Sequence, residues 1–317
     1  MIKDGRLKNF QISFLALVLG IVGFALVVQK MTGILNLNEA IFPVILNISL
    51  LVSTVIIGLY LLKAIFYSKE FLADFNHPIR VNFFPLLAKI LLIYSVMYYP
   101  INAQISKHVW IAGTAVQLLF SLIIIPRWLF GKYDIKQINP SWFIPIVGSV
   151  MVPIAGIHHF HHDLSWFFFS SGLIWWLLLF VMVIYRIIFH PPVKEKFLPT
   201  FYILFAPPAI AFISSVKLLG EVTAFGKILY FISLFMFIII FSRSYMFRKI
   251  KFYLSWWAYS FPIVALTVAT ILMFHETHLS FYKHLSLGLS GFLVLMVGYL
   301  IFRTGKAISK KDLCIEE

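Results

Sequence analysis

The chain has 317 residues, of which 61% are hydrophobic and 12% are charged, and its net charge at pH 7 is +14. This composition lies far outside the range of soluble domains and indicates a protein that crosses a lipid bilayer several times. The single cysteine, Cys314, excludes an intrachain disulfide and a metal site built from cysteines.

Ten apolar segments are each long enough to cross the hydrocarbon core, which takes about 20 helical residues. They cover residues 10–30, 41–66, 82–100, 106–130, 140–157, 164–189, 198–218, 222–243, 253–274 and 280–302. The first segment lacks a small-residue cleavage pattern, so we expect no cleavable signal peptide. Because the connections are short, the sequence predicts an all-α integral membrane protein with one membrane domain over residues 1–317 and a short polar tail at 303–317.

Basic residues gather in alternate connections. Most of the 26 lysines and arginines lie before the first segment, in the even-numbered connections or in the tail. The opposite side carries only Lys30, Lys107, Lys217, Lys227 and Lys283. Basic loops stay in the cytoplasm, so we expect a cell (inner) membrane protein with both termini cytoplasmic. The positive charge is then a signal of topology, and nucleic-acid binding is excluded.

Prolines recur in the odd-numbered segments, about one helical hairpin apart. The third, fifth, seventh and ninth segments contain Pro85, Pro145, the pair Pro207 and Pro208, and Pro262. Proline removes a backbone N–H and kinks a helix. Repeats of two spans are related by an axis along the membrane normal, so this spacing predicts five parallel hairpins around a central path. The kinked odd-numbered helices would then form an inner ring. The alternative is that the prolines recur by chance, because membrane helices tolerate proline.

Phe261 immediately precedes one of these prolines, within Ser255–Ala265. A kink frees polar backbone atoms, which in lipid need protein or water around them. We therefore expect Phe261 to face the protein interior or a pore. This stretch alone does not separate a functional phenylalanine from one that only packs beside a structural kink.

Charged residues within the segments are few. All twelve acidic residues fall in connections or tails, so a proton relay of the Asp/Glu kind has no residues to use. Lys89 lies deep in the third segment, one turn after Pro85, and no acidic partner lies in any segment. A cation there is costly unless it reaches water or an anion. Lys89 is a candidate anion attractor; the alternatives are a lysine that snorkels to an interface or sits neutral in a crevice.

Histidines cluster in the fifth connection. His158, His159, His161 and His162, followed by Asp163, could by spacing alone bind a metal or form a polar turn. We expect no metal site and no cofactor. The histidines lie at or near the external face with no mid-membrane pair for haem, so an enzyme or haem protein is not favoured.

Four stretches resemble a known family. Trp256–Pro262 resembles the ninth helix of the guard-cell slow anion channel of plants and of the bacterial tellurite-resistance protein TehA. Asn76–Phe84, Asn139–Pro145 and His162–Leu164 resemble the stretches that lead into the third, fifth and sixth helices. The similarity runs in order across most of the chain. The chain is thus similar to the tellurite-resistance/dicarboxylate transporter family.

The resemblance implies ten helices as five hairpins with quasi-fivefold symmetry, assembled as a homotrimer with one pore per protomer. It also implies passive conduction of anions such as chloride and nitrate, with the phenylalanine at Phe261 plugging the pore. Val18 stands where relatives often have proline, which leaves Gly20 and Gly23 as the flexible points of the first helix.

Two functions follow as hypotheses. The first is an anion-selective channel with small anions and the bilayer as its partners. The alternative is a secondary transporter of C4-dicarboxylate, sulfite or tellurite oxyanions, because names within the family record such roles. Coupling to protons would require a titrating site, which the acid-free segments do not obviously supply.

Overall fold

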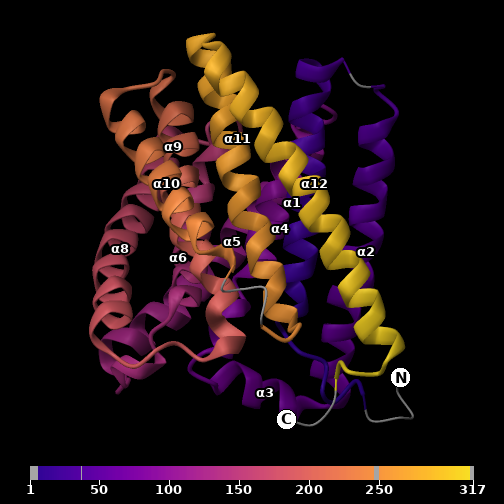
Figure 1. Ribbon diagram of the computed structural model, residues 1–317. Coiled ribbons are helices and arrows are strands. Elements are labelled where there is room, and N and C mark those ends of the chain that lie inside the picture. Colours follow the sequence, from indigo (N-terminus) through magenta and orange to yellow (C-terminus); the bar gives the residue numbers. More distant parts are fainter. Residues whose placement is uncertain (1–5, 37, 246–249, 315–317) are drawn as a thin grey trace.

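The computed structural model describes residues 6–36, 38–245 and 250–314. Within these ranges all regular structure is helical (Figure 1). Lys3, Arg248 and Lys249, three of the basic residues that predict the cytoplasmic side, lie outside the described residues, as do Asp4, Glu316 and Glu317.

Nine of the described helical segments are long and apolar enough to cross a membrane. They are α1 (Phe14–Leu35), α2 (Ile41–Phe66), η1 with α4 (Arg80–Tyr98), α5 (Ala103–Phe130), α8 (His162–Phe189), η4 with α9 (Glu195–Leu219), α10 (Ala224–Ser242), η6 with α11 (Leu254–Thr277) and α12 (Ser280–Ser309). A tenth apolar segment, Pro140–Gly156, is shorter and consists of η3 (Pro140–Phe143), α6 (Ile144–Met151) and α7 (Pro153–Gly156). These bounds lie close to the expected segments, except that α12 continues to Ser309, well into the stretch expected to be a tail.

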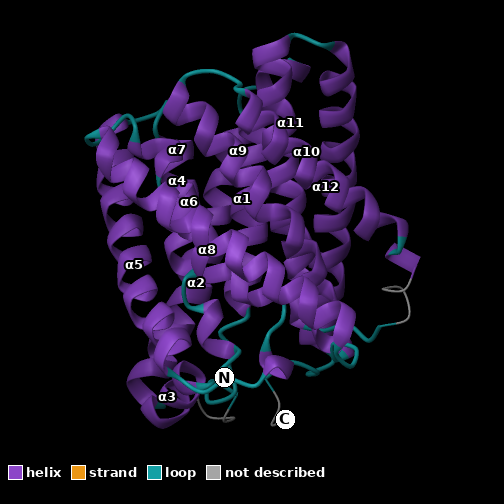
Figure 2. Ribbon diagram, turned by 90° about the vertical axis from the view of Figure 1, so that its left-hand side faces the viewer, coloured by secondary structure: helices purple, strands orange, loops and turns teal. Residues whose placement is uncertain are grey.

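Burial divides the long segments into two groups. In the segments containing α1, α4, α9 and α11, between 72% and 83% of the most apolar stretch is buried within the protein. In α2, α5, α8, α10 and α12 the share is between 22% and 33%. Figure 1 shows α8 and α2 at opposite edges of the bundle, and Figure 2 shows α5 at an edge with α1 near the middle. The first group therefore forms the core, and the second presents apolar side chains outward.

Contacts between elements show how the core closes. Going round it, α1 packs on α4, α4 on α6, α6 on α9, α9 on α11, and α11 again on α1. Each of these also packs on the long outer helix that follows it in the chain, as in the pairs α1 with α2 and α11 with α12. The core is thus a closed ring of five helical segments, each backed by an outer helix.

The prolines lie where one kind of helix changes into another. The 3₁₀ helices η1 (Arg80–Phe83), η3, η4 (Glu195–Phe205) and η6 (Leu254–Tyr259) lead into α4 (Leu86–Tyr98), α6, α9 (Ala206–Leu219) and α11 (Ser260–Thr277). Pro85 is the N-cap of α4, and Pro145, Pro207 and Pro262 lie within the first three residues of α6, α9 and α11. Early positions of a helix tolerate proline because their N–H groups lack an intrahelical partner.

The first helix has no such junction. α1 is a continuous helix, and Gly20 and Gly23 serve close packing instead of flexibility. A β-carbon at Gly20 would come within 2.8 Å of the Trp257 ring, and one at Gly23 within 3.0 Å of Val264. Glycine at these two positions therefore allows α1 to approach η6 and α11 closely.

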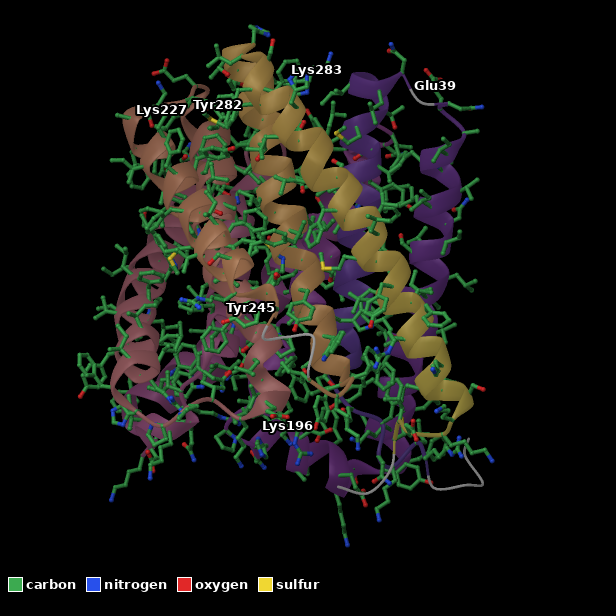
Figure 3. The ribbon with its side chains drawn as sticks, in the orientation of Figure 1. Glu39, Lys196, Lys227, Tyr245, Tyr282 and Lys283 are labelled. Carbon is green, nitrogen blue, oxygen red and sulfur yellow. The ribbon has the colours of Figure 1, made fainter. Side chains whose placement is uncertain are left out.

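The two ends of the bundle differ in which chain segments they contain. The start of α1, the end of α12 and α3 (Ser68–Asn76), a short helix that the sequence did not predict, lie at one end (Figure 1). Figure 3 places Lys196 towards this end and Lys227, Lys283 and Glu39 at the opposite end. This distribution matches the division of basic residues between the two sides that the sequence predicts.

Candidate functional site

A cavity lies inside the ring at the level of the 3₁₀-to-α junctions. All five core segments contribute to its lining, which consists of Ala16, Leu19, Phe83, Leu86, Lys89, Ile144, Val147, Ile203, Ala206, Trp257, Ala258, Phe261 and Pro262. The space open to a water-sized sphere is about 30 Å³. One water needs roughly 10–15 Å³ by this measure, so the cavity is narrow and has room for about two waters.

Phe261 reaches this cavity from the first turn of α11. Phe261 is only 8% exposed. It lies inside the ring, against the cavity, and not on the lipid-facing surface. The neighbouring Trp257 also lines the cavity, and its indole N–H donates a 3.0 Å hydrogen bond to the Thr304 hydroxyl on α12. This hydrogen bond fixes the junction between η6 and α11 to the outer helix α12, while Phe261 reaches the cavity inside the ring.

Lys89 is the only charged residue among those that line the cavity. It is 2% exposed, and its ammonium group has no hydrogen bond or ion pair with any described residue. The buried carboxylate of Asp74 is engaged elsewhere, by Lys63 and Arg80. At 2% exposure, Lys89 does not snorkel to an interface. A lysine buried without a partner is either neutral or accompanied by an anion or water in the cavity.

The prolines surround the cavity but contribute little of its lining. Pro262 lines it, whereas at the other three junctions the lining residue is the neighbour of Pro85, Pro145 or Pro207. The structure therefore gathers the four proline positions at one level of the ring.

Phe83 is a cavity residue that the sequence did not single out. The signal was present, because Phe83 and Phe84 precede Pro85 much as Phe261 precedes Pro262. Phe84 instead packs edge-on against Tyr60, Phe71 and Phe75 between helices. Without the helical phase of η1, the sequence could not tell which of the two rings points inward.

The histidines of the fifth connection lie at the other end and contact different partners. The His158 ring stacks on Tyr99 with centroids 4.2 Å apart, and His159 Nε2 lies 2.7 Å from the Ser106 hydroxyl. His161 pairs with Asp163 at 3.2 Å. In the part of the chain that the structure describes, no group of three or more metal-ligating side chains could hold a metal ion.

A closed ring of buried helices, backed by lipid-facing helices and enclosing a narrow apolar cavity, defines a membrane protein of the channel or carrier class. Residues 9–305 match the family described as voltage-dependent anion channel, SLAC1, and the chain belongs to this family. The resemblance carried by Trp256–Pro262 and the three other stretches is thereby confirmed.

Individual relatives come from plants, archaea and bacteria. The chain is 30% identical to the S-type anion channel SLAH2 of Arabidopsis thaliana over 267 residues, which are 83% of this chain and 51% of the plant protein. It is 26% identical to an uncharacterized transporter of Methanocaldococcus jannaschii over 295 residues, 84% of this chain and 86% of the archaeal protein. It is 24% identical to a tellurite resistance protein TehA homolog of Haemophilus influenzae over 259 residues, 80% of this chain and 76% of that protein. The chain thus spans about half the length of the plant channel and most of the length of the two others.

Proposed function

We propose that this protein is an anion-selective channel in which small anions such as chloride and nitrate pass along the axis of the five-segment ring. Phe261 is the plug that closes the path at the cavity, and its displacement opens the channel. The observation that carries this proposal is the cavity itself, which Phe261 and the unpaired Lys89 both line and to which all five core segments contribute.

The charges around the path support selectivity for anions. None of the residues that line the cavity is acidic, and the lysine there can attract an anion without competition from a carboxylate. A unit charge acts with several kcal/mol at close range in a partly desolvated site, so Lys89 lowers the barrier for anions and raises it for cations.

The symmetry, the helix junctions and the assembly are part of the same proposal. The five hairpins are related by quasi-fivefold symmetry about the path, and Pro85, Pro145, Pro207 and Pro262 kink the inner segments at the level of the plug. The protein lies in the cell (inner) membrane with both termini in the cytoplasm and assembles as a homotrimer with one pore per protomer. Light scattering of the detergent-purified protein tests the trimer.

A carrier of C4-dicarboxylate, sulfite or tellurite oxyanions is the second candidate. The names of the archaeal and bacterial relatives, a transporter and a tellurite resistance protein homolog, favour transport and tellurite. Lys89 is the one titratable residue in the cavity, so proton coupling would have to use it. Reversal potentials separate the two functions. In a channel they follow the anion gradient alone, whereas in a proton-coupled carrier they shift with pH at fixed anion concentration.

The decisive experiment replaces the plug. We expect Phe261→Ala to raise anion current at least tenfold in oocyte or planar-bilayer recordings, because the side chain that fills the constriction is removed. Phe212→Ala is the matched control, since Phe212 is a fully buried phenylalanine on α9 that packs on Tyr230 and does not line the cavity. An unchanged current in a well-expressed Phe261→Ala protein would show that Phe261 is not the gate.

A further inference from the structure

Three basic side chains gather at the end of the ring opposite the chain termini. Lys30 lies near the end of α1, Lys217 in the last turn of α9, and His158 in the turn that follows α7. All three belong to the inner ring and not to the outer helices. They lie beyond the cavity and include none of its lining residues.

These groups lie on elements that are not all neighbours in the ring. Going round it, α11 separates α1 from α9 on one side, and α4 and α6 separate them on the other. Contacts of nearby residues nevertheless place the three positions around one end of the ring. Gln29, next to Lys30, donates a 2.9 Å hydrogen bond to the Met97 carbonyl near the end of α4, and His158 stacks on Tyr99 at the same end. The helix α7, which ends just before His158, packs on α9. The cluster therefore lies at the end of the ring, beyond the cavity.

Among the described residues, the cluster has no acidic partner. Neither lysine makes an ion pair or a side-chain hydrogen bond with any of them. The nearby Asp163 pairs with His161, and Glu221, which follows α9, is exposed and forms no ion pair with a described residue. Like charges held together without acidic partners repel one another unless anions from solvent screen them.

We propose that Lys30, Lys217 and His158 form an external recruitment site that binds a small inorganic anion over the mouth of the ring, and that acid on this side strengthens it by charging His158. The site is separate from Phe261 and Lys89. Only the use of the bound anion for conduction rests on the proposed function.

The direction of the pH effect follows from the surroundings of His158. The imidazole of His158 stacks on Tyr99, and the charged or titratable groups that act on it are Lys217 and His162. The adjacent His159 forms a hydrogen bond with the Ser106 hydroxyl, and the charge of Lys107 acts on it. Burial, followed by the charges of Lys217 and His162, lowers the pKa of His158 below its usual value of 6.5. His158 is therefore neutral at pH 7 and becomes charged on acidification. A bound anion favours the charged form, so anion affinity and protonation rise together.

The first test uses the Phe261→Ala background, in which the plug is absent. We expect Lys30→Gln and Lys217→Gln each to raise the half-saturating external chloride concentration about threefold, with a smaller effect at high ionic strength. Half-saturation from the opposite side stays unchanged. The control is Lys227→Gln, which removes the same charge at the same end (Figure 3) but from the outer helix α10. Shifts no larger than those of the control would overturn the site.

A second variant tests the histidine. His158→Phe keeps an aromatic ring on Tyr99 but cannot be charged. We expect it to abolish the rise in apparent chloride affinity between external pH 7.5 and 5.5, while affinity at pH 7.5 stays within twofold of that of Phe261→Ala. A pH dependence that persists in His158→Phe would remove His158 from the site.

Anion binding without conduction keeps the two proposals distinguishable. Nitrate that binds the folded protein raises its melting temperature in detergent, relative to gluconate at equal ionic strength. We expect this shift in wild type and Lys227→Gln and its loss in Lys217→Gln. If Phe261→Ala passes no anion current but this pattern of melting temperatures holds, the channel proposal is wrong and the recruitment site is supported. If current flows but nitrate stabilises Lys217→Gln as much as wild type, the recruitment site is wrong and the channel proposal is supported.

Discussion

Gly20 on α1 lies directly against Trp257, the aromatic residue one turn before Phe261. A β-carbon at Gly20 would come within 2.8 Å of the Trp257 ring and would also clash with the Ser260 hydroxyl. The contact joins the uninterrupted helix of the ring to the segment that carries the candidate plug. The position of Phe261 therefore depends on the absence of a side chain at position 20.

Gly20→Ala is expected to displace the junction between η6 and α11. Overpacking of this kind costs about 1–3 kcal/mol, and the shift of Phe261 raises basal anion current. Thermal unfolding in detergent and current recordings measure the two effects. Gly58→Ala is the control, because Gly58 lies within α2 with nothing within 4 Å of an added β-carbon. The control should leave the current unchanged and stability equal or up to about 1 kcal/mol higher. Wild-type stability and current in Gly20→Ala would mean that this contact does not hold the plug.

Lys89→Met tests the charge in the constriction. In the Phe261→Ala background, we expect the ratio of anion to cation permeability to fall about tenfold or more, because removal of a nearby buried charge changes ion energies by more than 1.4 kcal/mol. The ratio is obtained from reversal potentials under a salt gradient. Poor folding would reduce all currents without shifting the reversal potential, so this readout is its own control. An unchanged ratio would leave Lys89 without a role in selectivity.

Hydropathy predicted the helices well because the thickness of the hydrocarbon core sets their length, as the match of 41–66 to α2 illustrates. Proline spacing indicated four of the five segments that form the ring, since each of these four carries its proline at a helix junction, whereas α1 has none. Close packing was not predictable, because Gly20 could be interpreted as a flexible point until the opposing Trp257 was located. The inward phase of Phe83 and the gathering of Lys30 with Lys217 likewise depend on tertiary geometry, which a single sequence does not carry.

Asp74 on α3 joins several segments through one buried carboxylate. It lies 2.6 Å from the Lys63 ammonium, 2.6 Å from the Arg80 guanidinium and 3.1 Å from the Tyr60 hydroxyl. Lys63 also donates a 2.9 Å hydrogen bond to the Phe10 carbonyl, ahead of α1. The side chains of Asp74 and Lys63 are 3% and 4% exposed. The pair therefore ties together the approach to α1, the end of α2 and the start of η1, which leads into α4.

Asp74→Asn should lower the free energy of unfolding by about 3–5 kcal/mol, because a buried ammonium loses its counter-charge. The double variant Lys63→Met, Asp74→Leu should recover most of that loss, since no buried charge remains. Thermal unfolding in detergent measures both. Asp163→Asn is the control, because its carboxylate is 88% exposed and such pairs contribute at most about 1 kcal/mol. If Asp74→Asn is no less stable than the control, the buried cluster does not hold the segments together.

The sidedness of the membrane can be tested with two lysines at opposite ends. Lys196 is the second residue of η4, and Lys227 lies in the first turn of α10 (Figure 3). In a Cys314→Ser background, which removes the single native cysteine, we expect a membrane-impermeant maleimide added outside intact cells to label Lys227→Cys and not Lys196→Cys. One substitution leaves most of the basic excess in place, so it should not invert the chain. Labelling of Lys196→Cys alone would place the termini outside and invert the proposed direction of anion recruitment. Labelling of both in cells shown to be intact would contradict the assignment of the two lysines to opposite faces.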